Sequence, residues 1–166
     1  MVPLGSAMLR ISKLTDYGTV VLACLATSPG TRFTASEVAE RTHLGLPTVS
    51  KLLKSLHRAG LLTSTRGAHG GYQLARPATA ISASAIIDAI EGPVAITECS
   101  GQHSMCEHEV SCSTGSAWQR INGAIRRSLD EVTLAQLAGQ EAVAVWRPHL
   151  AGAVRTLPAA RGPGRI

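Results

Sequence analysis

No stretch of this 166-residue sequence is apolar for long enough to cross a bilayer. The longest apolar run, residues 20–26, is far shorter than the ~20 residues that a membrane-spanning helix needs. The start of the chain also lacks a charged segment followed by a long apolar one, which a secretory signal requires. These absences predict a soluble cytoplasmic protein that does not contact a membrane.

The sequence also lacks the side-chain arrangements that catalysis requires. It shows no pairing of a nucleophile with a base and no paired catalytic carboxylates. The glycine-rich run at residues 66–71 is not followed by the Lys-Ser or Lys-Thr of a phosphate-binding loop. We therefore expect a protein that is not an enzyme. No internal repeat is present, and the length favours one modest core with an appendage.

Acidic residues are scarce in the first half of the chain. Residues 1–76 hold nine Lys and Arg against three acids, whereas residues 77–139 hold three Arg against seven acids. The formal net charge of the whole chain is +5. A concentrated positive charge favours a polyanionic partner, which we expect the first half to bind.

Apolar periodicity predicts a first helix that begins at Ser12 or Thr15, either of which can cap it, and ends near Pro29-Gly30. Its apolar face is expected to comprise Tyr17, Val20, Val21, Cys24 and Leu25.

A helix-turn-helix follows. Thr34 and Glu37 have the spacing of a capping box, and the short helix that they open should stop near His43-Leu44-Gly45, where glycine supplies the left-handed turn. Pro47 suits the first position of the next helix, which Gly60 ends. The buried stripe of that helix is expected to comprise Val49, Leu52, Leu53, Leu56 and Ala59.

A β-hairpin, called the wing below, is predicted after this helix. Its two strands are expected at residues 61–65 and 72–74.

The second half is predicted to contain a helix over residues 82–91, a loop with three cysteines, and a long helix over residues 116–137. Side chains on the first of these helices that should face inward are Ala83, Ile86, Ile87 and Ile90. A narrow apolar stripe runs along the long helix, as expected where a helix packs on a partner helix: Trp118, Ile121, Ile125, Leu129 and Val132.

The predicted fold class is therefore mainly α with a small β-hairpin wing: a winged helix-turn-helix plus a long C-terminal dimerisation helix. We expect a flexible N-terminal extension at 1–8, a DNA-binding winged helix-turn-helix at 9–78, a cluster-binding loop and dimerisation helix at 79–139, and a flexible tail at 140–166.

The predicted DNA contacts come from the second helix of the helix-turn-helix and from the wing. A major groove admits one helix, whose first residues meet base edges. Thr48, Ser50 and Lys51 are expected to face bases. Contacts to the backbone or the minor groove are expected from Lys54, Arg58, Arg66 and His69. The alternative is a winged helix that makes protein contacts and has a solvated basic face.

Cysteine spacing points to a metal. Cys99, Cys106 and Cys112 are separated by six and five residues, where three thiolates can converge on one centre, and sulfur ligands select zinc, cuprous copper or iron-sulfur clusters. A zinc site usually contains a pair of ligands two to four residues apart, which these cysteines do not supply, although His103 and His108 could complete a set. An iron-sulfur cluster, zinc and free redox thiols all stay open. Cys24 reads as a small buried hydrophobe.

Four motifs together resemble the Rrf2 family of winged-helix regulators: Leu14-Thr15-Asp16-Tyr17, the wing from Arg66 to Arg76, Glu91-Gly92-Pro93, and the three cysteines before Trp118. The resemblance covers about residues 8–139. Within the family it is strongest to regulators of the Suf iron-sulfur assembly system, with the Isc-type regulator and the nitric oxide-sensing repressor as relatives.

The resemblance implies a homodimer joined by the long helix, a 2Fe-2S or 4Fe-4S cluster on Cys99, Cys106 and Cys112, and repression of iron-sulfur assembly genes through a DNA operator. This chain has Gly115 where the Isc-type regulator has a ligating histidine. The nitric oxide-sensing relative instead uses an aspartate of the partner's first helix, which matches Asp16. Asp16 is therefore the favoured fourth ligand, with His103 or His108 as the runner-up. Alternatively, Asp16 binds no metal and is an ordinary acidic residue that interacts with the dipole at the start of its helix.

Overall fold

The computed structural model describes residues 11–67, 69–94 and 115–142. Its elements follow in the order α1 (Lys13–Ala26), α2 (Ala35–Thr42), α3 (Leu46–Arg58), β1 (Leu62–Thr65), β2 (Gly71–Leu74), the 3-10 turn η1 (Ala78–Ala80), α4 (Ala83–Glu91), α5 (Gly115–Asp130) and α6 (Leu134–Leu137). The described residues are mainly helical with one antiparallel hairpin, which confirms the predicted fold class. None of the described helices is both long and apolar enough to span a membrane. The predicted extension at 1–8 and residues 143–166 of the predicted tail lie outside the described residues.

Helix α1 begins where Ser12 caps it, because Ser12 Oγ accepts a hydrogen bond from the Thr15 N–H at 3.3 Å. The predicted apolar face was partly wrong. Val20 is 41% exposed. The buried side of the helix is instead centred on Gly18 and Leu25, and it is rotated from the predicted face by about 100° around the helix axis, which is the turn of one residue. The reason is that α1 packs on α2 and α3 as well as on α4 and α6. At Gly18 a Cβ would lie 2.2 Å from the Ile90 Cδ1, so glycine permits the approach of α4.

The helix-turn-helix forms as predicted, with one correction at the turn. Thr34 and Glu37 make the expected capping box at the start of α2. His43, not a glycine, takes the left-handed conformation after α2, with φ 56°. Gly45 instead caps α3 in an extended conformation, and Pro47 lies in the first turn of that helix. A left-handed His costs little at a helix end, so the glycine was not needed there.

Helix α3 buries its apolar side and leads into the wing. Four of the five predicted core residues are buried, namely Val49, Leu52, Leu53 and Leu56, whereas Ala59 is exposed because it forms the C-cap. Strands β1 and β2 pair antiparallel from Leu62 opposite Leu74 to Thr65 opposite Gly71. Tyr72 also bridges Phe33, which ties the wing to the segment before α2.

The prediction of one continuous helix over residues 116–137 is wrong, because the structure has two helices there. Helix α5 ends at Asp130, and Thr133 opens α6 with its own capping box to Gln136. Between them the chain bridges back to Ser82, and Leu134 is completely buried. The interruption allows the chain to leave the axis of α5 and place Leu134 in the core.

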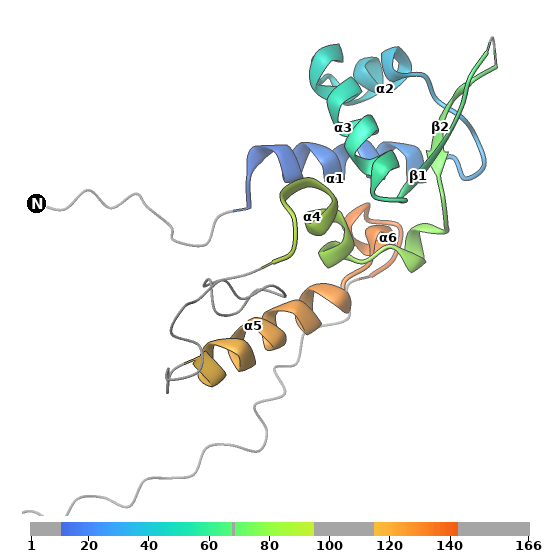
Figure 1. Cartoon of the computed structure of the whole chain (residues 1–166). Helices are drawn as coiled ribbons and strands as arrows, with labels where there is room; N and C mark the ends of the chain where they lie inside the picture. The colour runs from blue at the N-terminus through green and yellow to red at the C-terminus, as the bar shows by residue number, and fades with distance from the viewer. Residues whose placement is uncertain (1–10, 68, 95–114, 143–166) are drawn as a thin grey trace, which may run out of the picture.

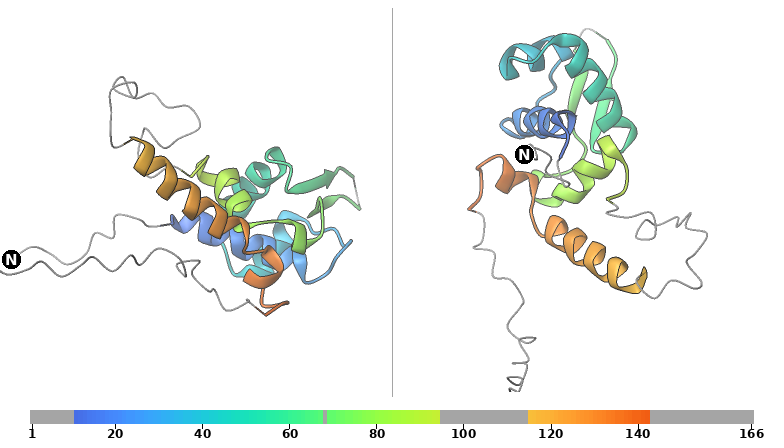
Figure 2. Two further views of the ribbon diagram at one scale, coloured as in Figure 1. Left: turned by 90° about the horizontal axis from the view of Figure 1, so that it is seen from below. Right: turned by 90° about the vertical axis from the view of Figure 1, so that its left-hand side faces the viewer.

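One apolar core joins the elements from α1 to α6. It contains Val21, Leu22, Leu25, Phe33, Val38, the four buried residues of α3, Leu61, Leu62, Ile81, Ile86 and Leu134. Of the predicted inward side of α4, Ile86 is 1% exposed and the others are partly buried. Figures 1 and 2 show α2, α3 and the hairpin at one end of the molecule and α5 at the opposite end.

Candidate nucleic-acid interface and metal centre

A row of cations lies on the solvent side of α3. Lys51, Lys54 and Arg58 are all exposed, opposite the buried stripe, as the helical period predicts. Thr48 and Ser50 flank the row and are half-buried. Among the described residues no ion pair neutralises these cations, since the salt bridge found there joins Arg126 to Asp88. The face therefore offers uncompensated positive charge on a helix that projects at one end of the molecule.

The wing is fixed next to α3 by a contact that the sequence did not predict. His57, in the last turn of α3, shares a hydrogen bond of 3.2 Å with Ser64 Oγ of β1. Its ring also meets the Tyr72 ring of β2 edge-on, with 6.3 Å between centroids. His57 thus joins the recognition helix to both strands of the wing. No sequence signal identified this contact, because it joins side chains of two different elements.

Arg66 and His69, the predicted wing contacts, are both exposed. They lie on the connection between β1 and β2, whose Ala68 is outside the described residues. The hairpin needs glycine at Gly71, where φ is 152° and a Cβ would lie 2.8 Å from the Phe33 carbonyl oxygen. The structure thus places all seven predicted DNA contacts on α3 and the wing, where they can meet a polyanion.

Asp16, the predicted fourth metal ligand, is exposed in the first turn of α1. This helix end is clamped by Glu91, the last residue of α4. Glu91 Oε1 accepts a hydrogen bond from the Ser12 N–H at 3.1 Å and another from the Thr15 hydroxyl. The hydrogen bonds from Thr15 and Ser12 hold the pKa of Glu91 below its ordinary value. The clamp, which the sequence did not predict, fixes the segment that carries Asp16 relative to the end of α4.

The predicted cluster ligands Cys99, Cys106 and Cys112, with His103 and His108, lie outside the described residues. Residues 11–67, 69–94 and 115–142 contain no group of three or more side chains that could hold a metal ion. The described residues on the two sides of the cysteine-bearing segment are nevertheless joined to each other. Its upstream end follows the Glu91 clamp, and the Val94 carbonyl accepts a hydrogen bond from Asn122 Nδ2 at 3.1 Å.

Cys24 fits the structural role predicted for it. Its side chain is half-buried in α1, and burial raises the pKa of the thiol, an effect that the Arg41 guanidinium partly offsets. A raised pKa means less thiolate, which is the form that binds metals. Cys24 is therefore a suitable control for the other cysteines.

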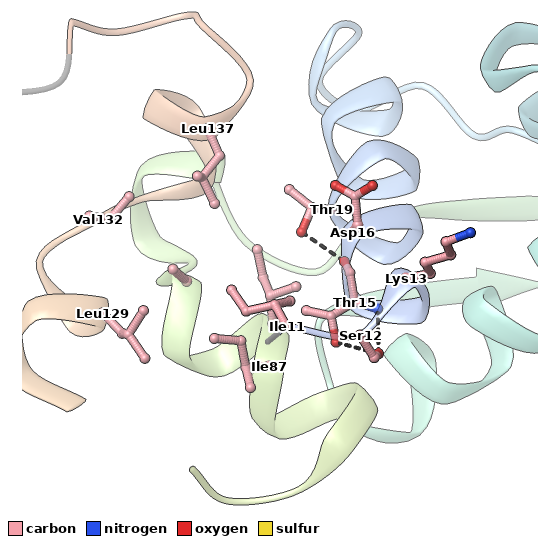
Figure 3. A pocket seen from close by; sticks show the side chains of 12 residues that line it. Ile11, Ser12, Lys13, Thr15, Asp16, Thr19, Ile87, Leu129, Val132 and Leu137 are labelled. Atoms are coloured by element: carbon pink, nitrogen blue, oxygen red, sulfur yellow. Dashed lines mark hydrogen bonds between the residues drawn. The ribbon is translucent and has the colours of Figure 1, made fainter. Parts of the chain in front are cut away.

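A pocket with a volume of about 670 Å³ opens beside Asp16, between α1, α4 and the chain that runs from α5 into α6 (Figure 3). One wall is apolar and consists of Ile11, Ile86, Ile87, Leu129, Val132 and Leu137, with Ala83. The other wall is the polar start of α1 and consists of Ser12, Lys13, Thr15, Asp16 and Thr19. Ile11 and Leu137 are 58% and 45% exposed, so the apolar wall is open to solvent.

Polar contacts hold α5 to its own chain. Arg126 Nη2 donates to Asp88 Oδ2 of α4 at 2.6 Å, and the Ser84 hydroxyl donates to Asp130. Along the apolar stripe of α5, Trp118 and Ile121 are 39% and 45% exposed, whereas Ile125, Leu129 and Val132 are half-buried. This arrangement leaves the first half of the stripe, Trp118 and Ile121, open to contact with another molecule.

Comparisons with known proteins agree with this architecture. A family described as "Rrf2: Iron-dependent Transcriptional regulator" matches residues 11–140. An HTH-type transcriptional regulator of Haemophilus influenzae is 34% identical over 135 residues, which cover 79% of this chain and 89% of that protein.

Two solved structures are also similar. The structure of CymR, the global cysteine regulator of B. subtilis, is 32% identical with a TM-score of 0.61 and matches 80% of this chain and 98% of CymR. The structure of T. potens IscR is 31% identical with a TM-score of 0.59 and matches 81% of this chain and 90% of that one. The residues that the family matches, 11–140, include the helix-turn-helix, the wing, α5 and α6.

Proposed function

Since the chain belongs to the Rrf2 family of transcriptional regulators, we propose that it binds a DNA operator as a homodimer under the control of an iron-sulfur cluster. The observation that carries the DNA part is the row of uncompensated cations on α3, next to a wing that also carries Arg66 and His69. The cluster part rests on the donor set: three thiolates match the preference of iron-sulfur clusters for sulfur ligands, and the carboxylate of Asp16 would complete the set.

In this proposal α3 enters the major groove with Thr48, Ser50 and Lys51 toward base edges. Lys54 and Arg58, nearer the end of the helix, contact phosphates, which fix the position of the protein on the duplex without reading sequence. Arg66 and His69 reach the backbone or the minor groove. The contacts of His57 to both strands keep the wing in register with α3, so the two elements meet DNA as one unit.

Cys99, Cys106 and Cys112 would hold the cluster, with Asp16 of the partner subunit as the fourth ligand. The exposure of Asp16 at a fixed helix end supports this role. When bound, the cluster supplies a centre that oxygen, nitric oxide or iron supply can alter. Asp16 would join the loop of one subunit to α1 of the other, and α1 packs on α3. Ligation thereby sets the angle between the two DNA-reading units, whose spacing must match half-sites about 34 Å apart.

The resemblance to regulators of the Suf system leads us to propose that the chain represses iron-sulfur assembly genes. The family description, an iron-dependent transcriptional regulator, agrees with an iron-linked signal. The domain limits predicted above, 9–78 for DNA binding and 79–139 for cluster binding and dimerisation, belong to the same proposal.

A second candidate is a regulator that responds through zinc or through thiol oxidation without a cluster, including one that acts through protein contacts. A solved structure of the oxidized form of Staphylococcus aureus CymR, 34% identical with a TM-score of 0.56, favours the variant with thiol oxidation. In that case the three cysteines would act as free or zinc-bound thiols.

The cluster is tested by purifying the full chain without oxygen and measuring its visible spectrum, iron and sulfide. We expect broad absorption at roughly 320–460 nm from sulfide-to-iron charge transfer. Cys106→Ala should abolish it and the matched Cys24→Ala should retain it, because Cys24 lies half-buried in α1. A colourless protein, even after anaerobic reconstitution, or one with stoichiometric zinc, would reject the cluster and favour the second candidate.

DNA binding is tested by selection from a library of random duplexes, followed by affinity measurement of the selected duplex against poly(dI-dC). If about six phosphates per dimer are contacted, the logarithm of affinity should fall with the logarithm of salt concentration with a slope of roughly −5. Equal affinity for the selected and the control duplex would mean that the protein reads no operator.

A further inference from the structure

Leu46 is an exposed apolar side chain at the start of α3. It is 44% exposed, and Pro47 beside it is exposed as well. The other large apolar side chains that are exposed in the described part of the chain lie before or within α1, on α5 and on α6: Ile11, Val20, Trp118, Ile121 and Leu137. Leu46 therefore lies apart from them, on the helix that carries the cations and at the end of the molecule that holds the wing (Figure 1).

Leu46 begins a row of side chains that extends along α3. At about 100° per residue, positions four apart differ by about 40° around the helix, so each member of the row lies next to the following one. The row consists of Leu46, Ser50, Lys54 and Arg58. Its chemistry changes from an apolar chain through a hydroxyl to two exposed cations. Leu46 thus continues, toward the start of α3, the line of residues that we expect to contact DNA.

The position of Leu46 along α3 favours contact with bases over contact with phosphates. Lys54 and Arg58, in the second half of the helix, are the proposed phosphate contacts, and Ser50 is a proposed base contact. Leu46 lies roughly 6 Å before Ser50 along the helix axis, at about 1.5 Å per residue. The first residues of such a helix are those that meet base edges in the major groove. When α3 is bound to DNA, Leu46 therefore lies at base edges together with Ser50.

The chemistry of leucine restricts what it can contact there. Leucine neither donates nor accepts hydrogen bonds, so a base nitrogen or oxygen buried against it would lose its water without a replacement. The apolar group that the major groove displays is the C5-methyl of thymine. Contact with that methyl removes two apolar surfaces from water, one of which is the exposed surface of Leu46. Thymine is therefore the base that Leu46 fits.

We propose that Leu46 is a base-reading residue that contacts the C5-methyl of one thymine in each half-site of the operator. This inference rests on the operator binding of the proposed function and adds a residue and the chemical group that it recognises. Ser50 and Lys51 read bases by hydrogen bonds, whereas Leu46 reads by apolar contact. The thymine lies within about two base pairs of the pair that Ser50 contacts, because roughly 6 Å along α3 compares with a rise of about 3.4 Å per base pair.

The test removes the methyl group and nothing else. Each thymine of the selected duplex is replaced in turn by deoxyuridine, at the matching position of both half-sites, and the affinity of the full-length protein is measured. At one position we expect the loss of a buried methyl, which is about 4-fold in dissociation constant per half-site and about 15-fold for the dimer on both half-sites. Leu46→Ala should bind the thymine and deoxyuridine duplexes of that position equally, because it lacks the apolar contact.

Two controls separate this contact from other causes of weaker binding. Lys54→Ala removes a phosphate contact, so it should weaken binding to both duplexes and keep the ratio of about 15 between them. Leu46→Ala should keep the wild-type slope of log affinity against log salt concentration, because leucine contacts no phosphate. The circular dichroism of Leu46→Ala should match the wild type, since Leu46 is exposed and alanine suits a helix.

An unchanged ratio between the thymine and deoxyuridine duplexes in Leu46→Ala would overturn the proposal, because another residue would then read the methyl. So would a wild-type protein that binds every deoxyuridine duplex as tightly as the selected one. In both cases the preference for the selected duplex over poly(dI-dC) still stands, so only the role of Leu46 is rejected. If the wild type binds the selected and the control duplex equally, the operator binding of the proposed function is rejected, and this inference with it.

Discussion

Glu91 should be the residue whose loss separates the start of α1 from the end of α4. Its carboxylate accepts hydrogen bonds from the Ser12 N–H at 3.1 Å and from the Thr15 hydroxyl, and these groups are 79 and 76 positions away in sequence. Glu91→Ala removes both acceptor contacts. Glu91→Gln keeps an acceptor oxygen but loses the negative charge near the positive end of the α1 dipole.

The size of the effect follows from the two contacts. A hydrogen bond to a charged group contributes ~1.5–3 kcal/mol when it is buried, and we take about 1 kcal/mol for each here because Glu91 is exposed. Glu91→Ala should therefore lower the free energy of unfolding by about 2 kcal/mol, and Glu91→Gln by about 1 kcal/mol. For a chain of this length the first value corresponds to a fall in Tm of roughly 4–8 °C.

The pH dependence provides an independent check. Because the pKa of Glu91 is lowered in the folded chain, its contribution is fully present above the ordinary value of 4.5 and is lost as the pH falls through the folded pKa. The stability difference between the wild type and Glu91→Gln, measured by urea unfolding, should shrink as the pH is lowered from 6 toward about 3.

A double-mutant cycle with Thr15→Val isolates the contact, since valine keeps the shape of this buried threonine. We expect a coupling energy of about 1 kcal/mol between positions 15 and 91. A coupling energy near zero, or a Glu91→Gln difference that does not change with pH, would show that the clamp contributes nothing in solution.

Three further predictions concern the DNA face, the wing and α5. Lys54→Ala should reduce the slope of log affinity against log salt by about 2 per dimer, since each subunit loses one phosphate contact, while Arg120→Ala on α5 should leave the slope unchanged. Gly71→Ala should lower the free energy of unfolding by ~1–3 kcal/mol, measured by thermal unfolding, because a Cβ there meets a backbone oxygen at 2.8 Å. The control is Gly45→Ser. It lies at a helix cap with φ −61° and should change the free energy of unfolding by only a few tenths of a kcal/mol. Arg126→Ala should speed amide exchange in α5, because it breaks the 2.6 Å salt bridge to α4; unchanged exchange would mean that this pair does not hold the helix.

Local rules predicted the helix-turn-helix well. The capping box of Thr34 and Glu37, the proline in the first turn of α3, and the stripe from Val49 to Leu56 all depend on neighbours within four residues, and all are confirmed. The exposure of Lys51, Lys54 and Arg58 follows from the same period. These features are encoded locally, so a single sequence is enough to find them.

Features that depend on distant partners were missed. The face of α1 was predicted about one residue step away from the true one, because periodicity cannot say that elements pack on two sides of the helix. The break between α5 and α6 was missed for a similar reason: the apolar spacing continues through Val132, but Thr133 pairs with Ser82, 51 positions earlier. The Glu91 clamp and the His57 contact are also long-range or side-chain specific.

The predicted metal ligands are neither confirmed nor contradicted by the structure, unlike the features of the helices and the wing. Their spacing is a sequence property, but whether the three thiolates meet depends on residues outside the described part of the chain. Of the predicted set, the structure places Asp16 alone, exposed at the start of α1. The cluster therefore stays a prediction that iron and sulfide analysis can decide.

The core has a consequence for anyone who wishes to transplant the DNA-reading unit into another protein. Leu134, which is fully buried against elements of the first half, comes after the cysteine-bearing segment and α5. The unit is thus discontinuous along the gene, and a fragment cut at residue 78 would lose Ile81, Ile86 and Leu134 from its interior. A working chimera must carry both segments, so the cysteine-bearing segment is an insertion within the fold and cannot be exchanged as a simple C-terminal cassette.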